Sequence, residues 1–228
     1  MKKHGYKFAW IGIVLTASLL TGGCTTNNNT TTPAAPLANE YVLQFQNGVH
    51  PDASYGGSSD TGMNAGSPAA SFYGDPYFYS GSAAGSAARY FVQFNLISLL
   101  PANVNVTRAY LTVNVVGAVG TNSFAFHSLS ETWDATTATW SNPWYANLGG
   151  NYSAAAKSDA IAMNEKGLYL FKLDAAMVKS WLATPSTNYG VILTATNESS
   201  GTSASGISTN SEPQLSLHPM LTVFYTLP

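Results

Sequence analysis

Apolar and polar residues alternate over short segments along most of the chain beyond residue 37. Ala109, Leu111, Val113 and Val115 are separated by Tyr, Thr and Asn residues, so this segment has one face for a core and one face for water. Segments of similar β-rich character predict strands at residues 41–45, 90–96, 108–116, 123–129, 167–173, 190–196 and 220–226.

One segment has the period of a helix instead. Asp174 is a good N-cap, Val178, Trp181 and Leu182 fall on one helical face, and Pro185 ends the run. Because strands dominate and no strand–helix–strand rhythm occurs, we expect an all-β fold, an antiparallel β-sandwich of jelly-roll-like form with one short helix.

The segment from 47 to 88 differs from the rest of the chain, since it is rich in Gly, Ser, Ala and Tyr and has few apolar residues. It is predicted to be a long loop that lies over the sandwich, with Tyr73, Tyr77, Phe78 and Tyr79 as contact points. Loops of this length in compact domains are commonly functional.

Composition narrows the choice of partners. Only 9% of the 228 residues are charged, against roughly 25% in an average soluble domain, so Ser, Thr, Asn, Gly and Tyr must cover the surface. Nine Lys and Arg against 11 Asp and Glu provide no basic field for a phosphate backbone, so nucleic acid is not an expected partner. A single cysteine excludes an internal disulfide and a Cys-rich zinc site.

The N-terminus has the layout of a signal peptide. Lys2, Lys3 and Lys7 precede an apolar run at 8–20 that is too short to span a bilayer comfortably. The small residues that follow lead into Cys24, a pattern that resembles a bacterial lipobox, in which the cysteine is acylated and begins the mature protein.

We therefore expect a lipoprotein signal peptide at 1–23, a Thr/Asn-rich tether at 24–36 and a single domain at 37–228. Lipidation of Cys24 would anchor the domain in the cell envelope, at the outer membrane or the cell surface, so the membrane is an expected partner through the lipid. The alternative is an ordinary secreted protein with a free thiol.

Aromatic residues are densest between 133 and 145. Trp133 and Trp140 are expected to fill the end of the sandwich, whereas Trp144 and Tyr145 follow a proline and are expected to be exposed. An exposed ring can hold the apolar C–H face of a sugar. The predicted ligand-binding residues are therefore Trp144 and Tyr145, with the loop tyrosines Tyr73, Tyr77 and Tyr79 as the next candidates.

Several segments, taken in order, carry a family resemblance. They are RYFVQFNL at 89–96, ETW at 131–133, ATW at 138–140, the predicted helix, and the closing strands at 188–193 and 219–225. Their order and spacing resemble DNRLRE-domain proteins, also classed as carbohydrate-binding module family 96, over roughly residues 41–225. The resemblance implies a β-sandwich module of secreted and surface proteins, some members of which bind acidic polysaccharides such as alginate.

Other chemistries have weaker support in the sequence. Glu131 and Asp134 are the nearest carboxyl pair for a glycosidase, but their simpler role is in turns and caps. No G-x-S-x-G, HExxH or phosphate-loop motif occurs, and the histidines at 50, 127 and 218 lack metal-ligand spacing. No catalytic or metal residue is therefore predicted.

Two residue groups leave alternatives open. Asp52, Asp60, Asn64 and Asp75 could supply oxygen ligands to a structural calcium ion, although their spacing matches no EF-hand. The two arginines in predicted strands, at 89 and 108, are expected to pair with carboxylates or to lie at the sandwich edge rather than to bind a ligand.

The sequence thus predicts a lipid-anchored, non-catalytic carbohydrate-binding module that binds polysaccharide. The alternative from another class is a structural surface protein, such as an adhesin or a filament or matrix subunit, which binds other surface proteins or its own copies. A third reading is a glycan-cleaving enzyme that uses Glu131 and Asp134.

Overall fold

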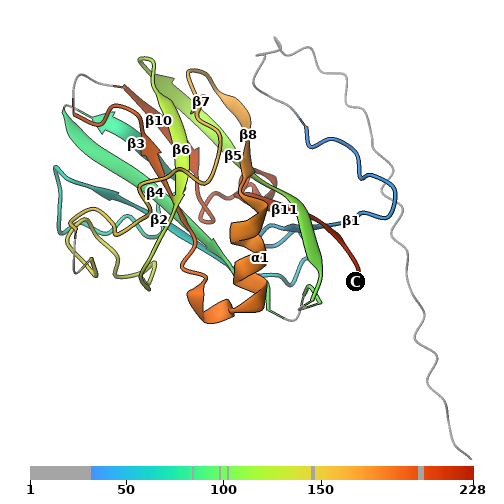
Figure 1. Ribbon diagram of the computed structural model, residues 1–228. Helices are drawn as coiled ribbons and strands as arrows, with labels where there is room; N and C mark the ends of the chain where they lie inside the picture. Colours follow the sequence, from blue (N-terminus) through green and yellow to red (C-terminus); the bar gives the residue numbers. More distant parts are fainter. Residues whose placement is uncertain (1–31, 84, 98, 102, 145–146, 200–202) are drawn as a thin grey trace, which may run out of the picture.

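The computed structural model describes residues 32–83, 85–97, 99–101, 103–144, 147–199 and 203–228. These residues form an antiparallel all-β fold with one α-helix, as the sequence predicts (Figure 1). The strands are β1 (Tyr41–Phe45), β2 (Ser58–Asn64), β3 (Tyr77–Ala83), β4 (Ser86–Phe94), β5 (Asn105–Val119), β6 (Ser123–Ser128), β7 (Ile161–Ala162), β8 (Gly167–Leu173), β9 (Val191–Ala195), β10 (Ser203–Ser208) and β11 (Met220–Thr226). The helix α1 covers Ala175–Ala183, and 3-10 turns follow at η1 (Pro185–Thr187) and η2 (Leu215–Leu217).

The strands form one curled sheet in the order β1-β11-β5-β10-β3-β4-β9-β6-β7, with β2 added to β4 and β8 added to β5. One half of the sheet is built around β5 with β11, β1 and β8, and the other around β4 with β2, β9 and β6. The pair β10–β3 connects the halves, because β10 pairs with both β5 and β3. In Figure 1, β2 and β4 lie to the left and β1 and β11 to the right.

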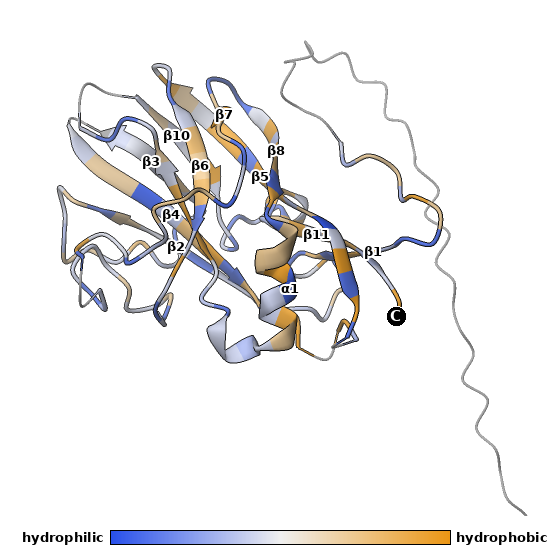
Figure 2. Cartoon of the chain, viewed as in Figure 1, coloured by the Kyte–Doolittle hydropathy of each residue, from blue (hydrophilic) through white to orange (hydrophobic). Residues whose placement is uncertain are grey.

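The main core lies between these two halves. Val92 of β4 and Leu111 of β5 are fully buried in it, and Phe126 of β6 meets Phe171 of β8 edge-on with ring centroids 4.9 Å apart. Burying such apolar side chains supplies about 1.5–3 kcal/mol each. Figure 2 shows the corresponding apolar colour along β5 and β6 and on α1.

Helix α1 begins where the sequence predicts. The Asp174 carboxylate accepts a hydrogen bond of 2.9 Å from the backbone N–H of Ala176, which caps the first turn. Val178 and Trp181 are 0% and 5% exposed and belong to the main core, so the predicted apolar face packs on the sheet.

A second, smaller core covers the outer face of β4. Phe91 points away from the main core and is fully buried. Residues from 129–144 and 147–152 cover it, and the rings of Trp133 and Trp144 meet Phe91 at centroid distances of 4.6 and 5.7 Å. The tryptophan-rich segment is therefore a cover for one sheet face.

The predicted loop at 47–88 is wrong, because this segment contains the strands β2 and β3. The inward positions of β3 include Ser80 and Ser82, which are fully buried although they are polar and small. A Cβ at Gly81 would lie 2.3 Å from the backbone oxygen of Ser203 in β10. A side chain at Gly81 would therefore collide with β10, and the small residues at 80–82 show no hydrophobic alternation in the sequence.

Candidate functional site

Trp144 does not occupy the exposed position that the sequence predicts. Only 4% of the residue is exposed, and its indole Nε1 donates a hydrogen bond of 2.7 Å to the carbonyl oxygen of Thr139. The exposure predicted for Trp144 is wrong because its ring packs edge-on against Phe91 in the smaller core. Tyr145, its predicted partner, lies outside the described residues.

Trp133 and Trp140 pack against the smaller core, so their predicted packing role is confirmed, but the site is the outer face of β4 rather than the end of the sandwich. The indole Nε1 of Trp133 donates a hydrogen bond of 2.8 Å to the carbonyl oxygen of Tyr189. Both rings are half-buried, which is typical of residues that close the edge of a core.

Arg89 pairs with a carboxylate, as predicted. Its Nη2 lies 2.6 Å from Oε2 of Glu198, and its Nη1 donates a 2.6 Å hydrogen bond to the carbonyl oxygen of Gly149. The guanidinium also lies 4.8 Å from the ring centroid of Trp140 and 5.2 Å from that of Tyr152. Although burial opposes it, the Glu198 carboxylate raises the pKa of Arg89. Arg89 thus connects β4 to Glu198 and to the rings and backbone at the edge of the smaller core.

Arg108 is paired as well. Its guanidinium contacts the carboxylate of Glu40 and lies 4.1 Å from the ring centroid of Phe224. Hydrogen bonds from Arg108 and Thr107 lower the pKa of Glu40 to about 2. The two arginines in strands are thus both engaged with carboxylates of this chain.

Three exposed tyrosines lie on β3 and just before it, and a fourth, Tyr41, lies apart from them on β1. Tyr77 and Tyr79 alternate with the buried Phe78, so they point to the outer face of the sheet and are 47% and 41% exposed. Their ring centroids are 5.9 Å apart and the rings are nearly perpendicular. Tyr73, in the preceding turn, is 56% exposed. We call the outer surface around Tyr77 and Tyr79 the tyrosine face.

The ring of Tyr79 lies across two neighbouring strands. A Cβ at Gly206 in β10 would lie 3.1 Å from Cζ of Tyr79, and a Cβ at Gly117 in β5 would lie 3.0 Å from its hydroxyl oxygen. The glycines therefore let one side of the ring rest on the sheet while the other side faces solvent. The sequence analysis did not identify either glycine. The available signal is a Gly inside a strand segment, which commonly marks a site where another group approaches the backbone closely.

Polar groups adjoin these rings. Ser208 of β10 is the register partner of Tyr77, and its hydroxyl accepts a 2.9 Å hydrogen bond from Nδ2 of Asn114 on β5. Neither β3 nor β10 contains Asp, Glu, Lys or Arg. The tyrosine face is therefore aromatic and lies on two strands without ionic side chains, while the hydroxyl of Ser208 beside it is fully buried and bonded to Asn114.

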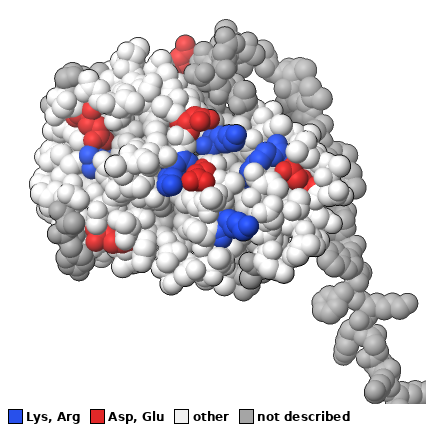
Figure 3. All heavy atoms as spheres, in the orientation of Figure 1, with Lys and Arg blue, Asp and Glu red and all other residues white. Residues whose placement is uncertain are grey.

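The few charges gather elsewhere. Figure 3 shows Lys, Arg, Asp and Glu side chains concentrated over the middle of the face shown there, around β8 and α1, with most of the surface uncharged. Lys157 forms an ion pair of 3.2 Å with Asp174 at the start of α1, and Lys179 donates to the Asn105 amide oxygen at 3.1 Å.

The carboxyl groups considered for catalysis have different surroundings. Oδ1 of Asp134 accepts hydrogen bonds from the hydroxyl and the backbone N–H of Thr136, which lower the pKa of Asp134. Oε1 of Glu131 is buried and has no hydrogen-bond partner among the described residues. Asp134 therefore serves a turn, as the sequence suggests.

Three of the residues considered for calcium accept hydrogen bonds from different partners within the chain. Asp52 accepts from Ser54, Asn64 accepts from the N–H of Gly66, and the Asp60 carboxylate accepts from Tyr90. Within the described ranges, no group of three or more His, Cys, Asp or Glu side chains is placed to hold a metal ion.

Comparison with protein-family models gives no match for this sequence, and no curated protein matches it. Among the helices of the described part of the chain, none is both long and apolar enough to cross a membrane.

Proposed function

We propose that this protein is a non-catalytic carbohydrate-binding module, tethered to the cell envelope by a lipid on Cys24, that binds polysaccharide through the tyrosine face. The observation that carries the proposal is the ring of Tyr79, which lies over Gly206 and Gly117 and still leaves 41% of the residue exposed. The resemblance to DNRLRE-domain proteins gives the same class of function.

A ring laid on a sheet is a suitable surface for a sugar. The backbone at Gly206 and Gly117 supports one side of the Tyr79 ring and fixes its position, so little side-chain freedom is lost when a ligand packs on the outer side. The apolar C–H face of a pyranose then contacts the ring, while its hydroxyl groups bond to water and to the phenol hydroxyls of the two exposed tyrosines. The perpendicular ring of Tyr77 forms a side wall.

The charge distribution favours a neutral polysaccharide. An acidic chain such as alginate needs cations, yet β3 and β10 contain none, and Arg89 and Arg108 are bound to Glu198 and Glu40. A cation already paired in this way offers little further attraction to a carboxylate ligand. We therefore expect neutral glycans to bind better than acidic ones.

A structural role is the second candidate, and one observation favours it. The strand β1 lies at an end of the sheet, and its Tyr41 and Val42 are 51% and 44% exposed. Exposed edge strands are able to pair with another chain. An adhesin, filament or matrix subunit would use such an edge to contact other surface proteins or a second copy.

Affinity electrophoresis tests the proposal. The protein migrates through gels that contain a neutral glucan, xylan, pectin or alginate, and we expect retardation in at least one neutral gel. The double change Tyr77→Ala/Tyr79→Ala should abolish it, whereas Tyr41→Ala, which removes an equally exposed tyrosine on β1, should not. Retardation of the double variant equal to that of the unchanged protein would disprove the tyrosine face as the site. Concentration-dependent self-association without glycan binding would favour the structural role.

A further inference from the structure

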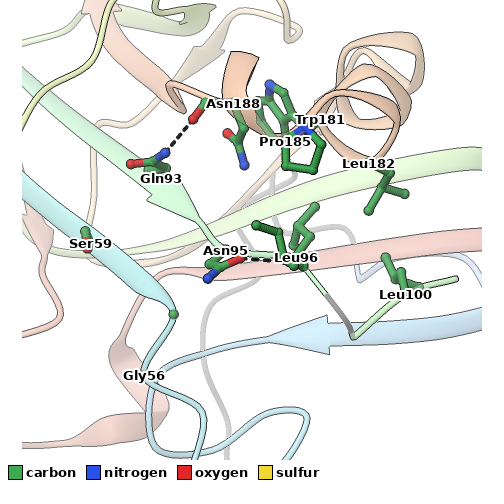
Figure 4. A pocket seen from close by; sticks show the side chains of 12 residues that line it. Gly56, Ser59, Gln93, Asn95, Leu96, Leu100, Trp181, Leu182, Pro185 and Asn188 are labelled. Carbon is green, nitrogen blue, oxygen red and sulfur yellow. Dashed lines mark hydrogen bonds between the residues drawn. The ribbon is translucent and has the colours of Figure 1, made fainter. Parts of the chain in front are cut away.

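A cavity of about 510 Å³ lies between the start of β2, the end of β4 and the α1–η1 segment (Figure 4). No residue of β3, which carries the tyrosine face, lines this cavity. Its volume is in the range of ordinary ligand sites, roughly 300–1,000 Å³. We call it the helix-side cavity. None of its twelve lining residues is Asp, Glu, Lys, Arg or His.

One wall of the cavity is polar. Gln93 of β4 and Ser59 of β2 are register partners, so their side chains share a face, and the amide of Asn95 follows on the same strand end. The helix side adds the amide of Asn188 beside the exposed Pro185 and the largely buried Trp181, and the exposed Ile97 also lines the cavity. Figure 4 shows these groups around a common space.

The amides are held in fixed positions. Nε2 of Gln93 donates to the carbonyl oxygen of Asn188, and Nδ2 of Asn188 donates to the carbonyl oxygen of Phe94 at 2.8 Å. Oδ1 of Asn95 accepts from the N–H of Ile97 at 3.0 Å. Within the described residues, Oε1 of Gln93 and Nδ2 of Asn95 keep no hydrogen-bond partner, so one acceptor and one donor remain for a ligand.

A neighbouring hollow of about 400 Å³ extends the cavity. The two share Gly56, Gly57, Asn95 and Ile97 in their linings, so they adjoin as one trough. The hollow adds the exposed carboxylate of Asp52, which disfavours an acidic ligand. A Cβ at Gly56 would meet no atom within 4 Å, which shows that the space beside this residue is open. A trough suits a ligand of several linked units better than a compact one.

From this lining we propose that the helix-side cavity is a second binding site, for an uncharged oligosaccharide. An acidic or phosphorylated ligand would find no cation there, and a purely apolar ligand would bury the free groups of Gln93 and Asn95 without partners, which is costly. A neutral sugar suits this mixed lining: its hydroxyls bond to the amides, and its C–H faces pack against the exposed side chains of Pro185 and Ile97.

The inference does not rest on the tyrosine face, because the two sites share no residue. The test therefore uses the whole chain with Tyr77→Ala/Tyr79→Ala as background, so that only the cavity can bind. Isothermal titration calorimetry is carried out with cellohexaose, laminarihexaose, mannohexaose, xylohexaose and maltohexaose. We expect one-to-one binding of at least one of them.

Two substitutions probe the cavity itself. Gly56→Leu fills the trough where the backbone has open space, and Asn95→Asp keeps the acceptor for the Ile97 N–H but removes the free donor. Each should weaken binding at least about tenfold, a loss of 1.4 kcal/mol, with an unchanged melting temperature. Tyr41→Ala should leave the affinity unchanged.

Several results would overturn the inference. The first is that no neutral hexasaccharide binds the background protein with a dissociation constant below about 1 mM. The second is that Gly56→Leu, still folded, binds as tightly as the background. Tighter binding of an alginate hexasaccharide than of every neutral one would also refute an uncharged ligand class, and binding of a proline-rich peptide with no glycan bound would assign the trough to a protein partner instead.

Discussion

The hydroxyl of Tyr90 donates a hydrogen bond of 2.7 Å to Oδ2 of Asp60, and this pair lies inside the sandwich, where Tyr90 is 0% and Asp60 6% exposed. The backbone N–H of Asn210 also donates to the Asp60 carboxylate at 3.0 Å. Burial nevertheless outweighs these bonds and raises the pKa of Asp60 to about 6. A raised carboxyl pKa means that folding favours the protonated acid.

This pair predicts an unusual pH dependence of stability. The stabilisation that the protonated Asp60 gives to the folded state is present in full below its ordinary pKa near 4. It is lost as the pH rises through 6, because the buried carboxyl must then ionise. The loss is on the order of 3 kcal/mol. Asp60→Asn should remove this part of the pH profile.

Thermal melts of the unchanged protein and Asp60→Asn between pH 4 and pH 8 measure the difference directly. Subtracting the two profiles is needed because His50, whose pKa is lowered by burial, contributes with the opposite sign in a neighbouring range. Parallel profiles for the two proteins would show that Asp60 is not buried as an acid.

A second prediction concerns the ion pair of Arg89 and Glu198. Their side chains are only 12% and 17% exposed, so Arg89→Met would leave a carboxylate with little access to water and should destabilise the protein by about 3 kcal/mol. Lys157→Met, which breaks a more exposed pair, should cost less than about 1 kcal/mol. Urea unfolding measures both.

The double change Arg89→Met/Glu198→Gln is the control for this pair, since it removes both charges at once. We expect it to be less destabilising than the sum of the two single changes. If the losses of unfolding free energy from the two single changes add up in the double variant, Arg89 stabilises the protein mainly through its contacts with the rings of Trp140 and Tyr152.

Trp144 gives a third prediction, which separates packing from recognition. Since the ring is buried against Phe91, Trp144→Ala should cost about 3–5 kcal/mol of unfolding free energy. Leu148→Ala, in the same segment but 63% exposed, should change stability by less than about 0.5 kcal/mol. A folded Trp144→Ala protein with unchanged melting temperature but lost glycan binding would restore the exposed-platform hypothesis.

Much of the fold could be predicted from the sequence, because several strands alternate clearly. The predicted strands at 41–45, 167–173 and 220–226 have the bounds that the structure shows, and the N-cap Asp174 marks the helix start. β10 and the second half of β3 could not be predicted in this way. Apart from Phe78 and Ile207, their inward positions hold small polar residues, and the contact between Gly81 and Ser203 is a tertiary one.

The candidate sites could be predicted from the sequence only in part. The alternation of Tyr77, Phe78 and Tyr79 carries the signal of a strand with an exposed aromatic face, but the surrounding Gly, Ser and Ala residues favour a loop in the sequence. The burial of Trp144 depends on how 129–152 folds onto β4, which no local pattern encodes. The helix-side cavity joins Gln93 to Asn188 from segments far apart in the chain, so its lining had no sequence signature.

A fourth prediction concerns the lipid anchor, which rests on sequence alone since Cys24 lies outside the described residues. Acyl chains contribute about 0.8 kcal/mol for each buried CH₂ group. Cys24→Ser in the full chain, expressed in a bacterium, should move the protein from the membrane fraction to the soluble fraction. Partition of the variant into detergent to the same extent as the unchanged protein would rule out the lipobox.

The central claim is that Tyr79, supported by Gly206 and Gly117, binds a sugar ring. The most direct measurement is isothermal titration calorimetry of the neutral polysaccharide that is retained most strongly in the gels, with the unchanged protein, Tyr79→Ala and Tyr41→Ala. We predict that Tyr79→Ala weakens binding at least about tenfold, as expected for loss of an aromatic anchor, while Tyr41→Ala and the unchanged protein bind equally. Equal affinity of folded Tyr79→Ala and the unchanged protein would contradict the claim.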